Sequence, residues 1–216
     1  MTETAIFEPG GYRYVRGPFQ YSGGVAAEDG FAIERVRFQT PVPLEEGFAR
    51  IEAYLDGIGR PYTSFAACEL RSPEPFSEQG FIDFNRVYVG TLERWGIFKD
   101  DENPVARSNV CPEINGPHGP SFHAFSYTVP ADAGAVPSFV IAGSAESPEG
   151  GATYEERIIR LGETTDDAIL EKAQYVIGAM ETRMTALGVG WSQSTVTHAY
   201  TIHDLHPFLG DELVSR

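Results

Sequence analysis

The strongest constraint on the fold is a pattern that occurs twice along the chain. A β-rich segment precedes an amphipathic helix, a Gly-X-Gly sequence ends the helix, and another β-rich segment follows. Apolar residues recur at intervals of three and four over 44–55 and again over 169–187, which predicts the two helices. Gly57-Ile-Gly59 and Gly188-Val-Gly190 end them. Strands combined with long helices in this way predict an α+β protein.

The repeated pattern predicts two units with a boundary in the Pro/Gly/Ala-rich stretch that starts at residue 130. The first unit is residues 1–130, and it contains a further helix over about 77–95. The second unit is residues 131–216, a partial copy with strands expected over 153–161 and 195–202. The helices are expected to pack on one face of a mixed, mostly antiparallel sheet. The alternative is that the two units look alike only because strand–helix–strand patterns are common.

Two β-rich runs, 103–111 and 122–129, are separated by a Gly/Pro-rich loop. This arrangement predicts an antiparallel hairpin that presents Arg107 and His123 to one pocket. Two structural alternatives remain open. Arg107 could instead form an ion pair with one of the many acidic residues. His123 is expected to share its strand face with Phe125, so it could instead be a buried structural histidine.

The formal net charge of −15 argues against a nucleic-acid partner, because nucleic-acid binding needs a basic surface to replace phosphate counterions. An acidic protein that binds an organic anion needs a local basic group. The arginines inside apolar runs, above all Arg107, are therefore the candidates for anion binding.

No apolar run approaches the roughly 20 residues needed to cross a membrane, and the first residues do not have the pattern of a signal peptide. The two cysteines, Cys68 and Cys111, are not arranged as a Cys-X-X-Cys pair, and two lone thiols fit a reducing compartment. A cytoplasmic location with no membrane partner is expected. Both cysteines are interpreted as small core residues rather than nucleophiles.

Four segments within residues 12–130 resemble the Rid (YjgF/L-PSP) family, whose fold is chorismate-mutase-like. Ser22-Gly23 stands where that family has a Ser-Gly after an early strand. Asn85 matches the asparagine that opens the second helix of the family. Residues 105–110 match its Pro-Ala-Arg-Ser segment, and residues 122–127 match its Val-Glu-Ile-Glu-Ala strand.

The chain departs from the Rid pattern at two positions and in length. Val105 replaces the proline of the arginine segment, with Pro104 one position earlier. His123 replaces the glutamate that orients water, and Rid proteins are usually about half as long. Over its whole length the chain is most similar to the 2-aminomuconate-type deaminases, in particular the 2-amino-5-chloromuconate deaminase group. Residues 201–208 contribute to that similarity.

The resemblance implies a cofactor-free deaminase that hydrolyses an enamine or imine amino acid of the 2-aminomuconate type and releases ammonia. Arg107 would bind the substrate carboxylate, because a guanidinium holds a carboxylate through two parallel hydrogen bonds. Ser22, Gly23 and Asn85 would line the site. His123 would orient or deprotonate the attacking water. No metal is expected, because an imine carbon is already electrophilic, and the Rid pattern implies a homo-oligomer, with a trimer favoured.

Two other functions remain open. One is a non-catalytic module that binds small carboxylates through the same arginine. The other is a chorismate-directed enzyme, for which the chain looks too short. The histidines near the C-terminus, His198, His203 and His206, match no common metal-ligand spacing. They are expected to line a pocket wall or the boundary between the two units.

Overall fold

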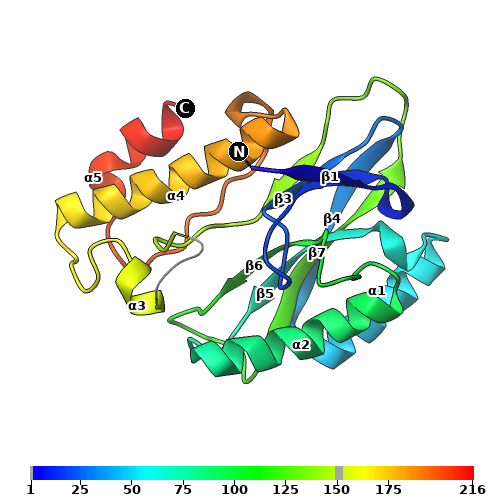
Figure 1. The fold of residues 1–216 in the computed structure, drawn as a ribbon, viewed down its shortest axis with the longest axis horizontal. Helices are drawn as coiled ribbons and strands as arrows, with labels where there is room; N and C mark the ends of the chain where they lie inside the picture. The colour runs from blue at the N-terminus through cyan, green and yellow to red at the C-terminus, as the bar shows by residue number, and fades with distance from the viewer. Residues whose placement is uncertain (1, 149–152) are drawn as a thin grey trace.

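The structure is a computed structural model that describes residues 2–148 and 153–216 (Figure 1). The strands are β1 (Thr4–Phe7), β2 (Tyr12–Val15), β3 (Gly24–Ala27), β4 (Phe31–Pro43), β5 (Phe65–Arg71), β6 (Ala106–Val110), β7 (Ser121–Pro130) and β8 (Phe139–Ile141). The α-helices are α1 (Leu44–Gly57), α2 (Glu78–Arg94), α3 (Tyr154–Arg157), α4 (Asp166–Leu187) and α5 (His206–Leu209). Short 3-10 turns lie at Glu8–Gly10, Tyr62–Ser64 and Trp191–Gln193, and a π-helical turn spans Gly210–Val214.

The strands form two four-stranded sheets. The first has the order β1-β2-β3-β8 and is antiparallel throughout, so a strand from beyond residue 130 completes a sheet built by the N-terminal residues. The second has the order β4-β7-β5-β6 and is mixed, because β5 and β6 are parallel. A parallel bridge between Ser22 and Ala106 connects the two sheets. The α+β class with a mixed sheet is confirmed.

Helices α1 and α2 cover one face of the second sheet, as expected from their apolar spacing. Phe48 of α1 makes edge-on ring contacts with Phe122 of β7 and Trp95, with centroids 4.9 and 5.3 Å apart. Gly47 is required here, because a Cβ at this position would lie 2.3 Å from the Phe122 ring. Burying each such aromatic side chain contributes about 1.5–3 kcal/mol. These contacts join α1 to β7 and to the residue that follows α2.

Helix α4 packs on the first sheet, on the other side of the molecule from α1 and α2 (Figure 1). Met184 and Leu187 are buried against Val15 and neighbouring residues. The helix ends at Gly188, which adopts a left-handed conformation with φ 71° that glycine tolerates without strain. Arg13 of β2 donates from Nη2 to the exposed end of the helix at the Leu187 carbonyl, 2.6 Å away. Residues far apart in the sequence therefore hold α4 on the sheet.

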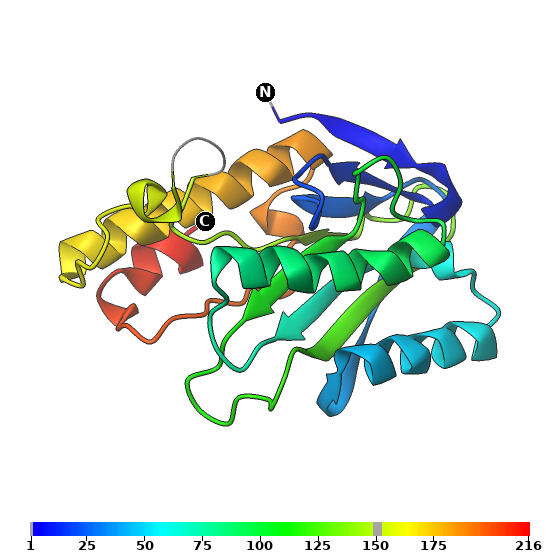
Figure 2. The same ribbon diagram turned by 60° about the horizontal axis from the view of Figure 1, so that its bottom comes forward.

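The helices predicted over 44–55, about 77–95 and 169–187 are confirmed, but two predicted strands are wrong. Residues 153–161 contain helix α3, because Thr153 and Glu156 form a reciprocal capping box that starts a helix. Residues 195–202 are extended but join no sheet, as Figure 2 shows for the orange segment that leads to α5. Their apolar side chains at Val196 and Ile202 are 67% and 75% exposed. The division into a unit 1–130 and a partial copy 131–216 stays a prediction.

None of the described helices has the length and apolar character needed to cross a membrane.

Candidate functional site

The predicted hairpin between the Arg107 and His123 segments is wrong. Strand β6 pairs with β5 in parallel, with Arg107 opposite Cys68, and β7 pairs with β4 and β5. One strand therefore separates β6 from β7. Local sequence favoured a hairpin because a turn-rich loop joins the two runs. The pairing is parallel because the chain crosses over the sheet through α2 on its way from β5 to β6.

Arg107 points toward α2 and is held there by Asn85. Its Nη1 donates to Oδ1 of Asn85 over 2.5 Å, and Nδ2 of Asn85 donates to the Phe81 carbonyl over 2.5 Å. Asn85 is fully buried, and Arg107 is 4% exposed. The amide oxygen of Asn85 is thus fixed by its own hydrogen bond and sets the orientation of the guanidinium. The structure brings these two predicted site residues together.

Four aromatic rings surround the Arg107 guanidinium. Its Cζ lies 4.8 Å from the Tyr88 ring centroid and 5.4 Å from that of Tyr21. The rings of Phe84 and Phe81 lie at 5.7 and 5.9 Å. Aromatic faces attract a cation but, unlike a carboxylate, they do not neutralise its charge. We call these four rings and Asn85 the arginine cage.

The cage leaves the charge of Arg107 without an acidic counterion. No carboxylate of the described residues lies within ion-pair distance of this guanidinium. Burial lowers the pKa of Arg107, while burial raises the pKa of the neighbouring Cys68 thiol to about 12. Cys68 therefore stays a neutral thiol beside the cation, in contact with the Tyr88 hydroxyl 3.4 Å away. The alternative of a structural Arg107–carboxylate ion pair does not hold for the described residues.

Ser22 and Gly23 lie between the two sheets, next to the strand that carries Arg107. The Ser22 amide donates to the Val105 carbonyl over 2.8 Å, and the Ser22 side chain is fully buried. Gly23 donates to the Val15 carbonyl over 2.9 Å and lines a cavity of about 550 Å³. Ser22 is therefore adjacent to the β6 backbone. Gly23 instead faces this cavity, whose lining does not include Arg107.

His123 lies on the opposite face of the sheet from Arg107. Phe122 pairs with Leu70 and Ala124 with Glu69, so His123 is the extra residue of a β-bulge. The bulge turns both Phe122 and Phe125 into the core, and His123 no longer shares a face with Phe125. Burial, then the positive charge of Arg71, lower the pKa of His123. Within one chain, His123 and Arg107 do not share a pocket.

The C-terminal histidines also lie apart from the cage. His198 contacts the Tyr200 hydroxyl over 3.1 Å, and His206 contacts the Asp204 carboxylate over 2.6 Å. In the part of the chain that the structure describes, no three His, Cys, Asp or Glu side chains are grouped as a metal site would require. Tyr200 in turn accepts a hydrogen bond from Arg71, so the extended C-terminal segment contacts the outer face of the second sheet.

Sequence reasoning missed the cage rings on α2. Phe81, Phe84 and Tyr88 recur at intervals of three and four, a pattern that indicates only the apolar face of the helix expected over about 77–95. The available signal was Asn85, a polar residue inside that face. Arg183, a buried arginine of α4 next to Gly23, was missed as well, because it lies within a helix whose other inward residues are apolar.

The fold and the cage define a class: an α+β protein with a mixed, Rid-like sheet and a buried guanidinium that pairs with no carboxylate of the described residues. A protein-family model described as 2-aminomuconate deaminase CnbZ matches residues 4–216. The chain is also 54% identical over 217 residues to a 2-amino-5-chloromuconate deaminase of Comamonas testosteroni, covering 100% of this chain and 86% of that protein. The chain belongs to the CnbZ family of 2-aminomuconate deaminases, and the resemblance found in the sequence is confirmed.

Proposed function

We propose that the protein is a deaminase that hydrolyses an enamine or imine amino acid of the 2-aminomuconate type and releases ammonia. The observation that carries the proposal is Arg107, a buried cation held by an amide and four rings instead of a carboxylate. A substrate carboxylate would supply the missing negative charge. The family membership and the named activity of the relative from Comamonas testosteroni support the same reaction.

In the proposed reaction, Arg107 binds the carboxylate next to the reacting carbon. The enamine tautomerises to an imine, water adds to the C=N bond, and the resulting carbinolamine expels ammonia to leave a C=O group. Asn85 holds the guanidinium in position, and Ser22, whose amide bonds to the Val105 carbonyl, supplies a backbone wall beside β6. Since only 4% of Arg107 is exposed, we expect rings of the cage to rotate aside as the carboxylate enters. The reaction needs no metal or organic cofactor, because the imine carbon is already electrophilic.

A general base would activate the water, and His123 is our candidate. Burial and neighbouring arginines lower the pKa of His123, which favours the neutral form that accepts a proton. One chain holds His123 and Arg107 on opposite faces of the sheet, so the two would meet only between copies. We therefore propose a homo-oligomer, with a trimer favoured, acting in the cytoplasm. Light scattering of the purified protein tests the oligomer, and a monomer with full activity would contradict this role of His123.

The proposed function is tested by incubating the purified protein with 2-aminomuconate and measuring ammonia. We expect stoichiometric ammonia release that requires the folded protein. The competing function is a non-catalytic module that uses Arg107 to bind small carboxylates. Saturable binding of muconate by a folded protein that releases no ammonia from 2-aminomuconate would favour that module and contradict the deaminase.

A further inference from the structure

A charged cluster surrounds His123 on the outer face of the second sheet. Leu70 of β5 is buried in the core, so its neighbours Glu69 and Arg71 lie on the opposite face of the sheet, away from α1 and α2. Arg35 of β4 reaches across β7 to Glu69, with its Nε 2.6 Å from Oε1 and its Nη2 3.1 Å from Oε2. His123, the bulge residue of β7, therefore lies among charged groups from both neighbouring strands.

Arg71 is fixed in this cluster, yet its charge is only weakly compensated. The residue is 8% exposed, and its Nη1 donates to the Leu70 carbonyl over 2.9 Å. Among the described residues, its one carboxylate within ion-pair distance is Glu69, whose Oε2 lies 3.8 Å from Nη2. Both oxygens of Glu69 already accept hydrogen bonds from Arg35. Two guanidinium groups thus share one carboxylate, and a positive charge remains beside His123.

Tyr200 of the extended C-terminal segment covers the Arg71 guanidinium. Its hydroxyl accepts a hydrogen bond from Nη2 over 3.1 Å, and its ring centroid lies 5.2 Å from Cζ. The same hydroxyl lies 3.1 Å from Nδ1 of His198. Because the hydroxyl oxygen accepts from Arg71, its own proton is available to this nitrogen. One tyrosine therefore links the arginine of β5 to a segment more than a hundred residues further along the chain.

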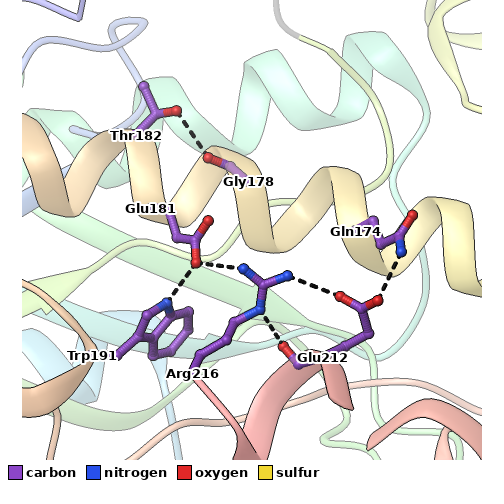
Figure 3. A network of polar contacts seen from close by, with 7 residues as sticks. All are labelled: Gln174, Gly178, Glu181, Thr182, Trp191, Glu212 and Arg216. Carbon is purple, nitrogen blue, oxygen red and sulfur yellow. Dashed lines mark hydrogen bonds and ion pairs between the residues drawn. The ribbon is translucent and has the colours of Figure 1, made fainter.

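The segment that carries Tyr200 is tied to α4 on both sides. Trp191, which precedes the segment, donates from Nε1 to Oε1 of Glu181 over 2.8 Å, and Arg216, which follows it, donates from Nη1 to the same oxygen over 2.7 Å (Figure 3). We call residues 195–202 between these ties the C-terminal strap. Side chains that are locked by such outer contacts can hold a neighbouring functional group in one geometry.

We propose that Arg71 and Tyr200 are positioning residues for the deamination: the C-terminal strap holds the Arg71 guanidinium beside His123, so the imidazole stays in the neutral form that can accept a proton. This inference rests on the proposed function, in which His123 is the general base. A fixed positive charge disfavours a second positive charge close to it. In agreement with this arrangement, burial and then the charge of Arg71 lower the pKa of His123.

Groups from three elements surround His123, and their signs determine the effect of removing Arg71. The described groups are Glu69 and Arg71 of β5, Arg35 and Arg37 of β4, and His198 and Tyr200 of the strap. The three arginines disfavour the imidazolium form, and Glu69 favours it. Without Arg71 one repulsion is lost while the attraction of the carboxylate remains, so the pKa of His123 is expected to rise.

The test measures the protonation of His123 directly, by NMR titration without substrate. The chain has five histidines, and His123→Asn identifies the imidazole signal to follow. In Arg71→Met the pKa of His123 is expected to rise above its wild-type value. In Arg71→Lys, which keeps the positive charge, it is expected to stay near the wild-type value. Arg50→Met is the matched control, because Arg50 pairs with Glu46 on the exposed side of α1, and it is expected to leave the pKa of His123 unchanged.

A second variant covers the case in which Arg71→Met does not fold. Tyr200 is 49% exposed, so Tyr200→Ala leaves the core intact while it removes both contacts to the guanidinium. The released guanidinium can move toward solvent, and the pKa of His123 is expected to rise here as well. Ile202→Ala, at an exposed residue of the same strap, is the control and is expected to leave the pKa of His123 unchanged.

The deaminase assay supplies a second measurement. In Arg71→Met and Tyr200→Ala the acid limb of kcat/KM is expected to move to higher pH, whereas a purely structural role would lower the rate without moving the limb. A wild-type pKa of His123 in both folded variants, or a rise in Arg71→Lys equal to that in Arg71→Met, would overturn the proposal. Because the titration needs no substrate, a protein that shows the expected pKa changes but releases no ammonia contradicts the deaminase alone, and the control of His123 by Arg71 stands.

Discussion

Nη1 of Arg107 donates to Oδ1 of Asn85 over 2.5 Å, and this amide–guanidinium contact joins strand β6 to helix α2 in the interior of the protein. A neutral amide holds the cation without neutralising it. An aspartate at position 85 would instead form a buried ion pair with Arg107. The difference between these two side chains determines whether Arg107 remains available to an organic anion.

Replacing Arg107 by methionine is expected to abolish productive substrate binding. Methionine fills a similar volume among the cage rings, so the fold is expected to survive with a loss of about 1–3 kcal/mol for the unpartnered Asn85 oxygen. Losing charge-assisted hydrogen bonds to the carboxylate lowers kcat/KM by about 100-fold or more. Ammonia release measures the effect, with Arg94→Met on the exposed side of α2 as the control. Unchanged turnover by folded Arg107→Met would remove Arg107 from the site.

Asn85→Asp is expected to inactivate the site without unfolding the protein. A carboxylate at position 85 would pair with Arg107 and remove the positive charge that attracts the substrate. We expect KM to rise at least about 10-fold, with an unfolding midpoint at or above that of the wild type. Asn85→Leu, which removes the acceptor but adds no charge, separates the effect of charge from the loss of the hydrogen bond. Substrate affinity equal to wild type in Asn85→Asp would show that the charge of Arg107 is not used.

The Tyr88 ring, rather than its hydroxyl, is expected to matter for the cage. The ring centroid lies 4.8 Å from the Arg107 guanidinium carbon, whereas the hydroxyl contacts the neutral thiol of Cys68. Tyr88→Phe is expected to cost less than about 1.5 kcal/mol of unfolding free energy, and Tyr88→Ala about 3–5 kcal/mol. Chemical denaturation of the two variants measures the difference. Equal losses in both would assign the stabilisation to the hydroxyl.

The role of His123 predicts a pH dependence. Burial and nearby arginines lower the pKa of His123 from its ordinary value of about 6.5, so the neutral base persists to lower pH. The acid limb of kcat/KM is therefore expected below pH 6.5, with activity falling as the pH decreases through the pKa. In His123→Asn the limb should disappear and the rate fall by about 100-fold or more. A wild-type rate and profile in this variant would exclude His123 as the base.

The buried thiol of Cys68 predicts a loss of stability in alkali. The pKa of Cys68 is raised to about 12 in the folded protein by burial, above its ordinary value of about 8.5 in an unfolded chain. The folded state therefore binds more protons between these values, and the stabilisation is complete below pH 8.5 and is lost as the pH rises toward 12. Denaturant unfolding of wild type and Cys68→Ala at pH 8 and pH 10.5 measures this. The variant should lose less stability over that interval, and equal losses would contradict the assignment.

Local properties of the sequence were sufficient to predict helices α1, α2 and α4 and the α+β class. They also pointed to Arg107 as a candidate site residue, and the family resemblance added Asn85, which the structure places in contact with it. Helical periodicity and glycine stops depend on residues within a few turns of each other, so they can be read along the chain. An arginine inside an apolar run of an acidic protein is likewise visible without coordinates. The match to the Rid pattern rests on the same short segments.

The tertiary structure alone decided which strands pair, which face His123 occupies, and what surrounds each buried arginine. The β5–β6 pairing is parallel because the chain crosses over through α2, and a one-residue bulge moves His123 to the other face of the sheet. Arg183 meets Gly23 only after α4 has docked on the first sheet. These contacts join segments many residues apart, and their free energies depend on packing that no local pattern encodes.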